Sequence, residues 1–235
     1  MKKGKRILTG IALVLFIGAL GFAAYVILQV RTITAAGCDT RSTDEVIALS
    51  GLAYNTSIFN VDKQQIMDNL STDPYIKPIS VDIQYPDHVV ITIEERKEAA
   101  RIEKDSAYIV IDHEGWVLRF ETEPDASAYP IVAGLPADTV LIGQQIGTTD
   151  TFKIGVLTRV LDALKTAEVA PVLIDMSLAA DIVLTLPDGL KVELGDDTAL
   201  DEKLALYKAS LSQIASIGKS GGILDVASVK NAYYR

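Results

Sequence analysis

The side chains that could carry acid–base or metal chemistry are few and lie far apart in the sequence. The chain has two histidines, His88 and His113, and a single cysteine, Cys38. His88 follows an expected turn and His113 lies within an expected hairpin turn, so we expect both to be solvated loop residues. Zinc sites need closely spaced Cys and His ligands, and the sequence has neither Cys-x-x-Cys nor His-x-x-x-His. These residues therefore predict no metal centre.

Paired carboxylates are the second arrangement that commonly carries chemistry. Glu94, Glu95 and Glu98 are close in sequence, but Arg96 and Lys97 stand between them. A mixed run of this kind is typical of a charged segment at a domain junction rather than of an acid–base pair. We therefore expect no catalytic residue, no metal site and no cofactor, and the sequence favours a binding protein over an enzyme.

An uncharged apolar run near the N-terminus predicts a transmembrane helix over residues 7–30. As a helix this run would span about 36 Å, which is enough for a hydrocarbon core of roughly 30 Å. Basic residues precede the run, and only Arg31 follows it closely, so the positive-inside rule places residues 1–6 in the cytoplasm as a short tail. The preceding basic residues are Lys2, Lys3, Lys5 and Arg6.

Two other interpretations of this N-terminal segment remain open. A cleaved signal peptide would have an apolar core of about 7–15 residues, which is shorter than the run here. A lipoprotein signal is suggested by Ala35-Ala36-Gly37-Cys38, which resembles a weak lipobox. Such a motif usually abuts the apolar core, whereas Gln29 and Arg31 intervene in this chain.

The net charge of the chain after the apolar run argues against two kinds of partner, nucleic acid and anionic lipid. The net charge changes from −9 to −13 when the four N-terminal basic residues are left out. Nucleic-acid binding needs clustered Lys and Arg, so this excess of acid argues against it and against adhesion to anionic lipid. A single cysteine cannot form an internal disulfide, so the fold depends on its hydrophobic core.

The order of elements after the apolar run indicates a small α+β domain. Ile33–Ala36 is expected to be a strand, and Ser42 with Glu45 forms a capping-box pattern that begins a short helix. A second helix is expected to begin at Asn60 or Asp62. Alternating apolar residues then predict two strands, which are residues 79–83 and 89–93. The order is β-α-α-β-β over residues 33–95.

The rest of the chain is expected to form a second, strand-rich domain with helices. The apolar spacing predicts one helix over residues 151–167 and another that Thr198 caps, with Leu200 and Leu204 on its buried face. Short strands bounded by turn residues account for the remainder. These expected strands are Tyr108–Ile111, Trp116–Phe120, Leu173–Met176, Ile182–Leu186, Leu190–Leu194 and Ile223–Val226.

The expected C-terminal strand is the best candidate for a binding surface. An exposed sheet edge offers backbone N–H and C=O groups to a strand from a partner. Val229, Tyr233 and Tyr234 follow this strand, and aromatic residues are enriched where interfaces carry most of their binding energy. The alternative is a frayed tail without a function.

The order and spacing of several short segments resemble those of the FtsQ/DivIB family of bacterial cell-division proteins, over nearly the whole chain. The resemblance implies a POTRA domain at residues 31–99 and a β-domain at residues 100–235. The segments are Ile33-Thr34-Ala35-Ala36-Gly37, Ser57-Ile58-Phe59-Asn60-Val61-Asp62, Asp73-Pro74-Tyr75-Ile76-Lys77, Tyr85-Pro86-Asp87-His88-Val89, Ile111-Asp112-His113-Glu114-Gly115, Tyr129-Pro130, Leu186-Pro187-Asp188-Gly189 and Ile223-Leu224-Asp225.

What the resemblance implies about function is a non-enzymatic divisome scaffold at the septum. In the family, late strands of the β-domain receive a segment of an FtsB/DivIC-type partner, which is paired with an FtsL-type protein. The POTRA domain and the membrane helix are implicated in septal localisation and in contacts with the septal peptidoglycan synthesis machinery. The implied partner-binding residues here are Asp225, Ser228, Val229, Lys230, Asn231 and Tyr233.

The chain departs from the family pattern at two places. Arg96-Lys97-Glu98-Ala99-Ala100 stands where the family often has Arg-x-Pro-Val-Ala, and Ala227-Ser228 stands where it usually has Arg-Tyr. Two alternative functions are a POTRA-bearing assembly or secretion component and a membrane-anchored cell-wall enzyme. The first usually has tandem POTRA modules or a long barrel, and the second needs a catalytic set that the sequence does not show.

Overall fold

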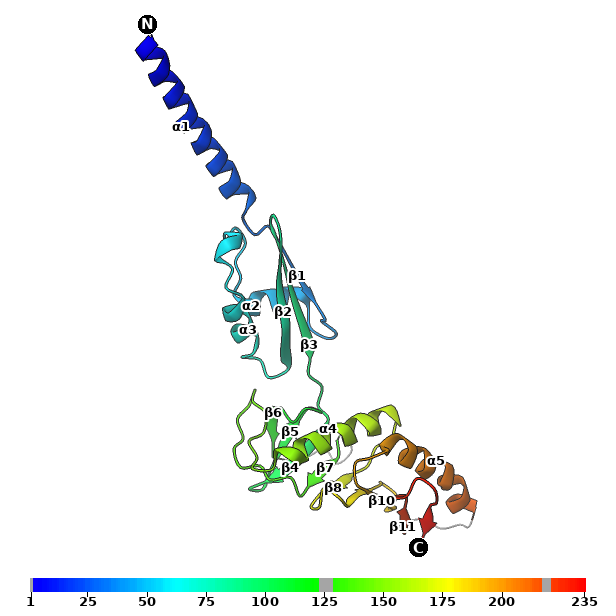
Figure 1. Cartoon of the computed structure of the whole chain (residues 1–235). Coiled ribbons are helices and arrows are strands. Elements are labelled where there is room, and N and C mark those ends of the chain that lie inside the picture. The colour runs from blue at the N-terminus through cyan, green and yellow to red at the C-terminus, as the bar shows by residue number, and fades with distance from the viewer. Residues whose placement is uncertain (1, 123–128, 217–220) are drawn as a thin grey trace. The chain divides into compact units, whose positions relative to one another are not determined.

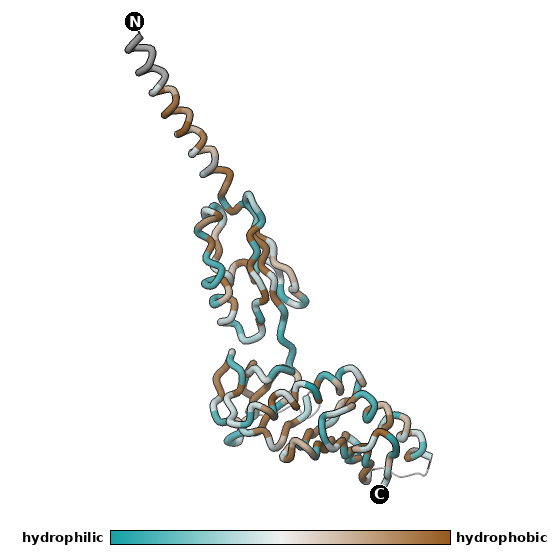
Figure 2. Tube along the Cα trace, viewed as in Figure 1, coloured by the Kyte–Doolittle hydropathy of each residue, from teal (hydrophilic) through white to brown (hydrophobic). Residues whose placement is uncertain are grey.

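The computed structural model describes residues 2–122, 129–216 and 221–235. These residues form two compact units, residues 1–95 and 96–235, which are described separately (Figure 1). Helix α1, Lys2–Ile27, begins the first unit. Its Gly10–Ile27 portion is long and apolar enough to cross a membrane by length and composition, as the brown colour in Figure 2 shows.

Helix α1 ends at Ile27 because the next residues pair with the folded part of the first unit. Gln29 forms an antiparallel bridge with Ser57, and the Val30 N–H donates to the Thr56 carbonyl at 2.8 Å. The apolar run of the sequence continues to Val30, whose side chain is fully buried in the core of this unit. The last residues of the run therefore contribute to a protein core.

The folded part of the first unit has the predicted β-α-α-β-β order. Strands β1 (Thr32–Ala36), β2 (Ile76–Gln84) and β3 (His88–Glu95) form a sheet in the order β1-β3-β2, in which β1 is parallel and β2 antiparallel to β3. Three further elements come between β1 and β2 in the sequence. They are helix α2 (Thr43–Ser50), the 3-10 turn η1 (Ile58–Asn60) and helix α3 (Lys63–Leu70).

Capping residues explain where the two short helices begin. The Ser42 hydroxyl accepts the Glu45 N–H at 3.2 Å, and the Asp62 carboxylate accepts the Gln65 N–H at 3.0 Å. Each bond satisfies one of the four N–H groups that a helix leaves unpaired at its start. Of the two predicted caps for the second helix, Asp62 is therefore the one used.

The second unit is built on a nine-stranded sheet with the order β12-β11-β10-β9-β8-β7-β4-β5-β6. Its core joins strand residues such as Ile174 and Leu184 to residues of α4 and α5 such as Leu157 and Leu204. These strands are β4 (Ala100–Lys104), β5 (Ala107–Ile111), β6 (Val117–Glu121), β7 (Ile131–Ala133), β8 (Leu173–Asp175), β9 (Ile182–Thr185), β10 (Lys191–Gly195), β11 (Ile223–Asp225) and β12 (Tyr233–Tyr234).

Helices α4 (Thr151–Thr166) and α5 (Leu200–Ser216) pack on this sheet and on each other. The prediction that Thr198 caps the second of them was wrong. The Thr198 hydroxyl and N–H instead donate to the Asp196 carboxylate at 2.6 and 3.2 Å, and the first helical bond joins the Lys203 N–H to the Ala199 carbonyl. The α+β class with an N-terminal apolar helix, a POTRA-type unit and a mixed β-rich unit is confirmed.

Candidate partner-binding edge

The last strand of the chain lies at one end of the nine-stranded sheet. Strand β11 pairs in parallel with β10, and β12 returns antiparallel to β11. The Ile223 N–H donates to the Arg235 carbonyl and the Arg235 N–H to the Ile223 carbonyl, each at 2.9 Å. Within the described residues the strand order ends at β12, so this two-residue strand forms the sheet edge.

Side chains next to β12 hold it against the sheet. The Nη2 atom of Arg235 donates to both oxygens of the Glu193 carboxylate, at 2.7 and 2.8 Å. The Tyr234 hydroxyl donates to the Gly221 carbonyl at 2.8 Å, and its ring packs against the core. Gly222 has a φ of +92°, and a Cβ there would lie 2.7 Å from the Tyr234 hydroxyl, so this close approach requires glycine.

The predicted partner-binding residues fall into two groups in the structure. Asp225 ends β11 and is half-buried, and its carboxylate accepts the Ala227 N–H at 3.0 Å. The other residues lie in the turn segment or on β12 and are exposed; Val229 has 41% and Tyr233 has 61% of its surface accessible. This exposed group is Ser228, Val229, Lys230, Asn231 and Tyr233.

Sequence reasoning did not find the residues that support this edge from β10 and α5. Gly195 has a φ of +67°, and a Cβ at this position would lie 2.9 Å from that of Ala227, so β10 closely approaches the exposed segment. The neighbouring Asp196 is held by Lys203, a lysine only 2% exposed, whose ammonium donates to the Asp196 carboxylate at 2.8 Å and to its carbonyl at 2.9 Å. The sequence signal for this contact is Lys203 itself, a lysine on the apolar side of α5.

The carboxylates that first suggested chemistry have separate structural partners. The exposed Glu94 pairs with Lys77 at 3.5 Å. Glu98 binds Arg119 through two contacts of 2.6 and 3.1 Å. Glu95 accepts backbone N–H groups of residues 39–41 at 2.9–3.1 Å and the Thr40 hydroxyl. Each carboxylate thus stabilises a local structure.

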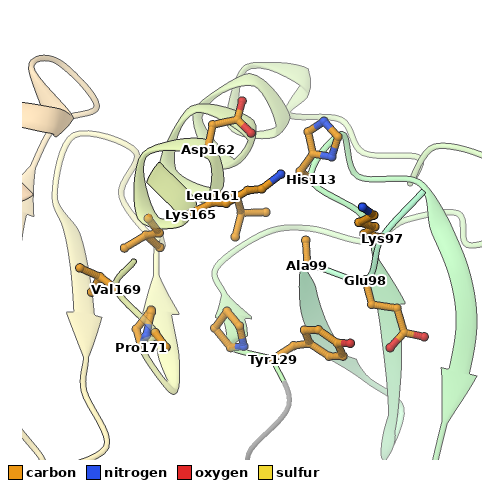
Figure 3. Close-up of a pocket in the computed structure, with 13 residues that line it drawn as sticks. Lys97, Glu98, Ala99, His113, Tyr129, Leu161, Asp162, Lys165, Val169 and Pro171 are labelled. Atoms are coloured by element: carbon orange, nitrogen blue, oxygen red, sulfur yellow. The ribbon is translucent and has the colours of Figure 1, made fainter. Parts of the chain in front are cut away.

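The two histidines belong to different units. His88 begins β3, and its Nε2 lies 2.9 Å from the Thr34 hydroxyl on the neighbouring strand. His113 is one of the residues that line a cavity of about 360 Å³ in the second unit (Figure 3). The lining includes the apolar residues Leu161, Val169 and Pro171 together with charged residues of α4 and of the segment before β4.

In the parts of the chain that the structure describes, the ionisable side chains do not form a metal-binding site. In those parts no three His, Cys, Asp or Glu side chains form a group that could hold one. Burial raises the pKa of Tyr129 at the cavity, and the neighbouring Glu98 carboxylate raises it further. A phenol held in its neutral form is suited to hydrogen bonding rather than to proton abstraction.

These features define a class of protein: an α+β chain with the N-terminal apolar helix of a single-pass membrane protein, a POTRA-type unit and a β-rich unit with a C-terminal edge strand. Comparison with known families gives the same division. Residues 28–96 match the POTRA domain of FtsQ type, and residues 100–229 match the C-terminal domain of the cell division protein FtsQ/DivIB. Because the second match alone covers more than half of the chain, the protein belongs to the FtsQ/DivIB family.

Relatives found by sequence support this assignment. The cell division protein DivIB of Bacillus subtilis is 29% identical over 210 residues, covering 86% of this chain and 73% of the relative. FtsQ of Geotalea daltonii is 24% identical over 233 residues, covering 92% and 82%. FtsQ of Syntrophotalea carbinolica is 28% identical over 102 residues, covering 43% of this chain and 36% of the relative. A solved extracytoplasmic domain of Geobacillus stearothermophilus DivIB aligns with a TM-score of 0.33 at 14% identity, over 52% of this chain and 97% of the domain.

Proposed function

We propose that the protein is a non-enzymatic scaffold of the division machinery, and that its C-terminal edge receives a strand from an FtsB/DivIC-type partner paired with an FtsL-type protein. The observation that carries this proposal is the position of β12 at the end of the sheet, beside the exposed Val229 and Tyr233. A sheet edge supplies backbone hydrogen bonds to an added strand, and exposed aromatic residues beside it supply apolar contact. Through these partners the scaffold would help to coordinate septal peptidoglycan synthesis.

The proposed topology puts this edge outside the cell. Residues 1–6 form the cytoplasmic tail, and residues 7–30 contain the membrane-crossing part of the chain, which ends with helix α1 at Ile27. Residues 31–99 and 100–235 are the extracytoplasmic POTRA domain and β-domain at the septum. Strand β1 argues against a lipoprotein signal, because cleavage before Cys38 would remove the strand that pairs with β3 and carries the buried Ile33.

The contacts of the ionisable residues favour a scaffold over the alternative of a cell-wall enzyme. Glu94, Glu95 and Glu98 are each held by a different partner, which favours structural roles for these carboxylates over roles in catalysis. The family assignment favours a role in division over one in secretion, because the named relatives are cell division proteins.

Co-purification tests the proposed site. The full chain is expressed with a DivIC/FtsB-type partner and an FtsL-type partner, solubilised in detergent and captured by a tag on its N-terminus. We expect a chain that ends at Val226 to lose both partners, because this truncation removes β12 and the exposed segment before it. If the truncated chain retains them at the level of the full chain, the C-terminal site is wrong.

The truncation needs a control for folding and a control for the choice of edge. Retained Trp116 fluorescence would show that the β-domain remains folded without its last residues. A matched substitution, Phe120→Ala, changes an aromatic residue that is 49% exposed on β6, at the opposite end of the same sheet. We expect this variant to retain both partners.

A further inference from the structure

Three large aromatic side chains are exposed at one end of the first unit. Tyr54 is 54%, Phe59 68% and Tyr85 65% exposed. Phe59 lies in η1, Tyr54 lies in the loop before it, and Tyr85 lies in the turn between β2 and β3. The ring centroids of Phe59 and Tyr85 are 6.3 Å apart. We call these three residues the aromatic tip.

Backbone hydrogen bonds tie the aromatic tip to the segment that directly follows helix α1. The Ile58 N–H, next to Phe59, donates to the Leu28 carbonyl at 2.9 Å. The Asn55 N–H, next to Tyr54, donates to the Val30 carbonyl at 2.8 Å. Both acceptors lie within three residues of Ile27, where α1 ends.

The turn that carries Tyr85 is tied to the same segment. The N–H groups of Arg31 and Thr32 donate to the Asp87 carbonyl at 2.8 and 3.1 Å. In Figure 1 the tip of the β2–β3 hairpin accordingly lies at the end of the small sheet that residues 28–31 approach. Four residues of extended chain reach at most about 14 Å, so the tip stays close to the helix end whatever direction the helix takes.

We infer that the aromatic tip inserts into the headgroup region of the bilayer that α1 spans, and so docks the POTRA domain on the membrane. This inference rests on the proposed membrane anchorage. Aromatic residues favour the membrane–water interface, where the ring is desolvated and a phenol hydroxyl keeps polar partners. Because α1 already holds the tip beside the lipid, the insertion is an intramolecular step with a high effective concentration.

The inferred partner is the uncharged, interfacial part of the bilayer rather than an anionic lipid. The chain is acidic, with a net charge of −9, so electrostatic attraction to anionic headgroups does not drive the contact. Burial of aromatic area is independent of lipid charge. Insertion is therefore expected in a bilayer of phosphatidylcholine alone.

Depth-dependent fluorescence quenching tests the inference on the full chain in phosphatidylcholine nanodiscs. In a Cys38→Ala background, an environment-sensitive fluorophore is attached to Phe59→Cys, and its quenching by lipids spin-labelled at defined depths is measured. Phe16→Cys, within α1, reports on membrane spanning. Asp44→Cys, an exposed residue in the first turn of α2 after the opposite end of β1, is the matched control in the same unit.

We expect the label at residue 59 to lie about 5–10 Å inside the headgroup boundary, the label at residue 16 near the bilayer centre and the label at residue 44 in water. The double substitution Tyr54→Ser and Tyr85→Ser should move the label at residue 59 toward water. The label at residue 44 should remain unquenched by the spin-labelled lipids in this variant. This result together with an unchanged circular dichroism spectrum would show that the variant remains folded.

Two results would overturn the inference, and they are distinguishable from failure of the anchor. If the label at residue 16 is quenched and the label at residue 59 is quenched no more than that at residue 44, the tip does not enter the bilayer although the anchor stands. If the label at residue 59 is shielded only after a division partner is added, the tip is a protein interface instead. If the label at residue 16 is itself unquenched, the membrane anchorage and this inference both fail.

Discussion

Tyr233 lies directly opposite Asp225 in the antiparallel pair of β12 with β11. The two residues close the exposed turn segment from both ends, but their side chains differ in what they contact. Asp225 accepts the Ala227 N–H, whereas the Tyr233 ring is 61% exposed. Within the proposed site, Asp225 therefore positions the segment and Tyr233 is available to touch a partner.

Substitution of Asp225 is expected to separate positioning from direct contact. Asp225→Ala removes the acceptor for the Ala227 N–H and should cost about 1 kcal/mol in the free energy of unfolding. Asp225→Asn keeps a side-chain oxygen and should cost less, with partner binding near that of the wild type. Urea unfolding and a binding titration on both variants check this. Equal loss of partner binding in the two variants would show instead that the charge itself contacts the partner.

We expect the Glu95 carboxylate to make the stability of the POTRA domain sensitive to acid. Burial acts to raise its pKa, but the hydrogen bonds from Thr40, Arg41 and Asp39 outweigh it and lower the pKa from 4.5 to about 2. A depressed pKa contributes stability that is fully present above the unfolded value and is lost as the pH falls from about 4.5 through about 2.

Glu95→Gln should lower the stability of the POTRA domain at pH 7 and flatten its dependence on pH between 5 and 2. The readout is urea unfolding followed by the methyl NMR signal of the buried Ile91. Glu94→Gln is the matched control, because the neighbouring Glu94 carboxylate is exposed and its pair with Lys77 is a longer contact of 3.5 Å. A steep acid transition that persists in Glu95→Gln would contradict the assignment.

A buried ion pair stabilises the start of the second unit. The Arg96 guanidinium lies 2.5 Å from the Asp112 carboxylate and 4.1 Å from the centre of the Trp116 ring, with Asp112 fully buried. Asp112→Ala leaves the arginine charge without its buried partner and should cost about 3–5 kcal/mol. Unfolding can be followed by the fluorescence of Trp116, the only tryptophan. Glu114→Ala, which removes a partly exposed partner of Arg96 at 3.0 Å, should cost about 1 kcal/mol or less.

The buried Lys203 controls the protonation of Asp196 beside the C-terminal edge. Hydrogen bonds from Lys203 and then Thr198 lower the pKa of Asp196 to about 2. Lys203→Met should raise this pKa toward its ordinary value of 3.8, and Thr198→Val should raise it less. Carbon NMR titration of the Asp196 carboxyl group measures both. An Asp196 pKa that stays near 2 in Lys203→Met would show that the lysine does not cause the shift.

The predictable part of the fold is the part with local periodic signals. The strand over residues 79–83 alternates apolar and polar residues, and the helix at 151–167 has apolar residues at helical spacing, so both were found. Strand β4 was missed because its buried Arg101, whose guanidinium donates to the Tyr129 carbonyl at 2.7 Å, looks like a surface residue in sequence. Strand β7 has three residues between Pro130 and Pro136, which leaves no room for a periodic pattern.

The resemblance gives the candidate partner-binding residues, which stay a prediction. The contacts that support this edge of the sheet could not be predicted from the sequence. Glu193 and Arg235 are 42 residues apart, and only the pairing of β10, β11 and β12 brings them together. Gly222 likewise gives no local sign that a tyrosine hydroxyl twelve residues later would occupy the space of its Cβ. Long-range pairing, rather than residue type, determines both contacts.

The affinity of Tyr233→Ala for a DivIC/FtsB-type partner tests the central claim most directly. Titration calorimetry on the full chain in nanodiscs should show about 30-fold weaker binding, corresponding to roughly 2 kcal/mol for an aromatic interface residue. Phe120→Ala, the matched exposed aromatic on the opposite edge strand, should bind as the wild type does. Wild-type affinity in Tyr233→Ala, or an equal loss in both variants, would contradict the claim that the C-terminal edge receives the partner.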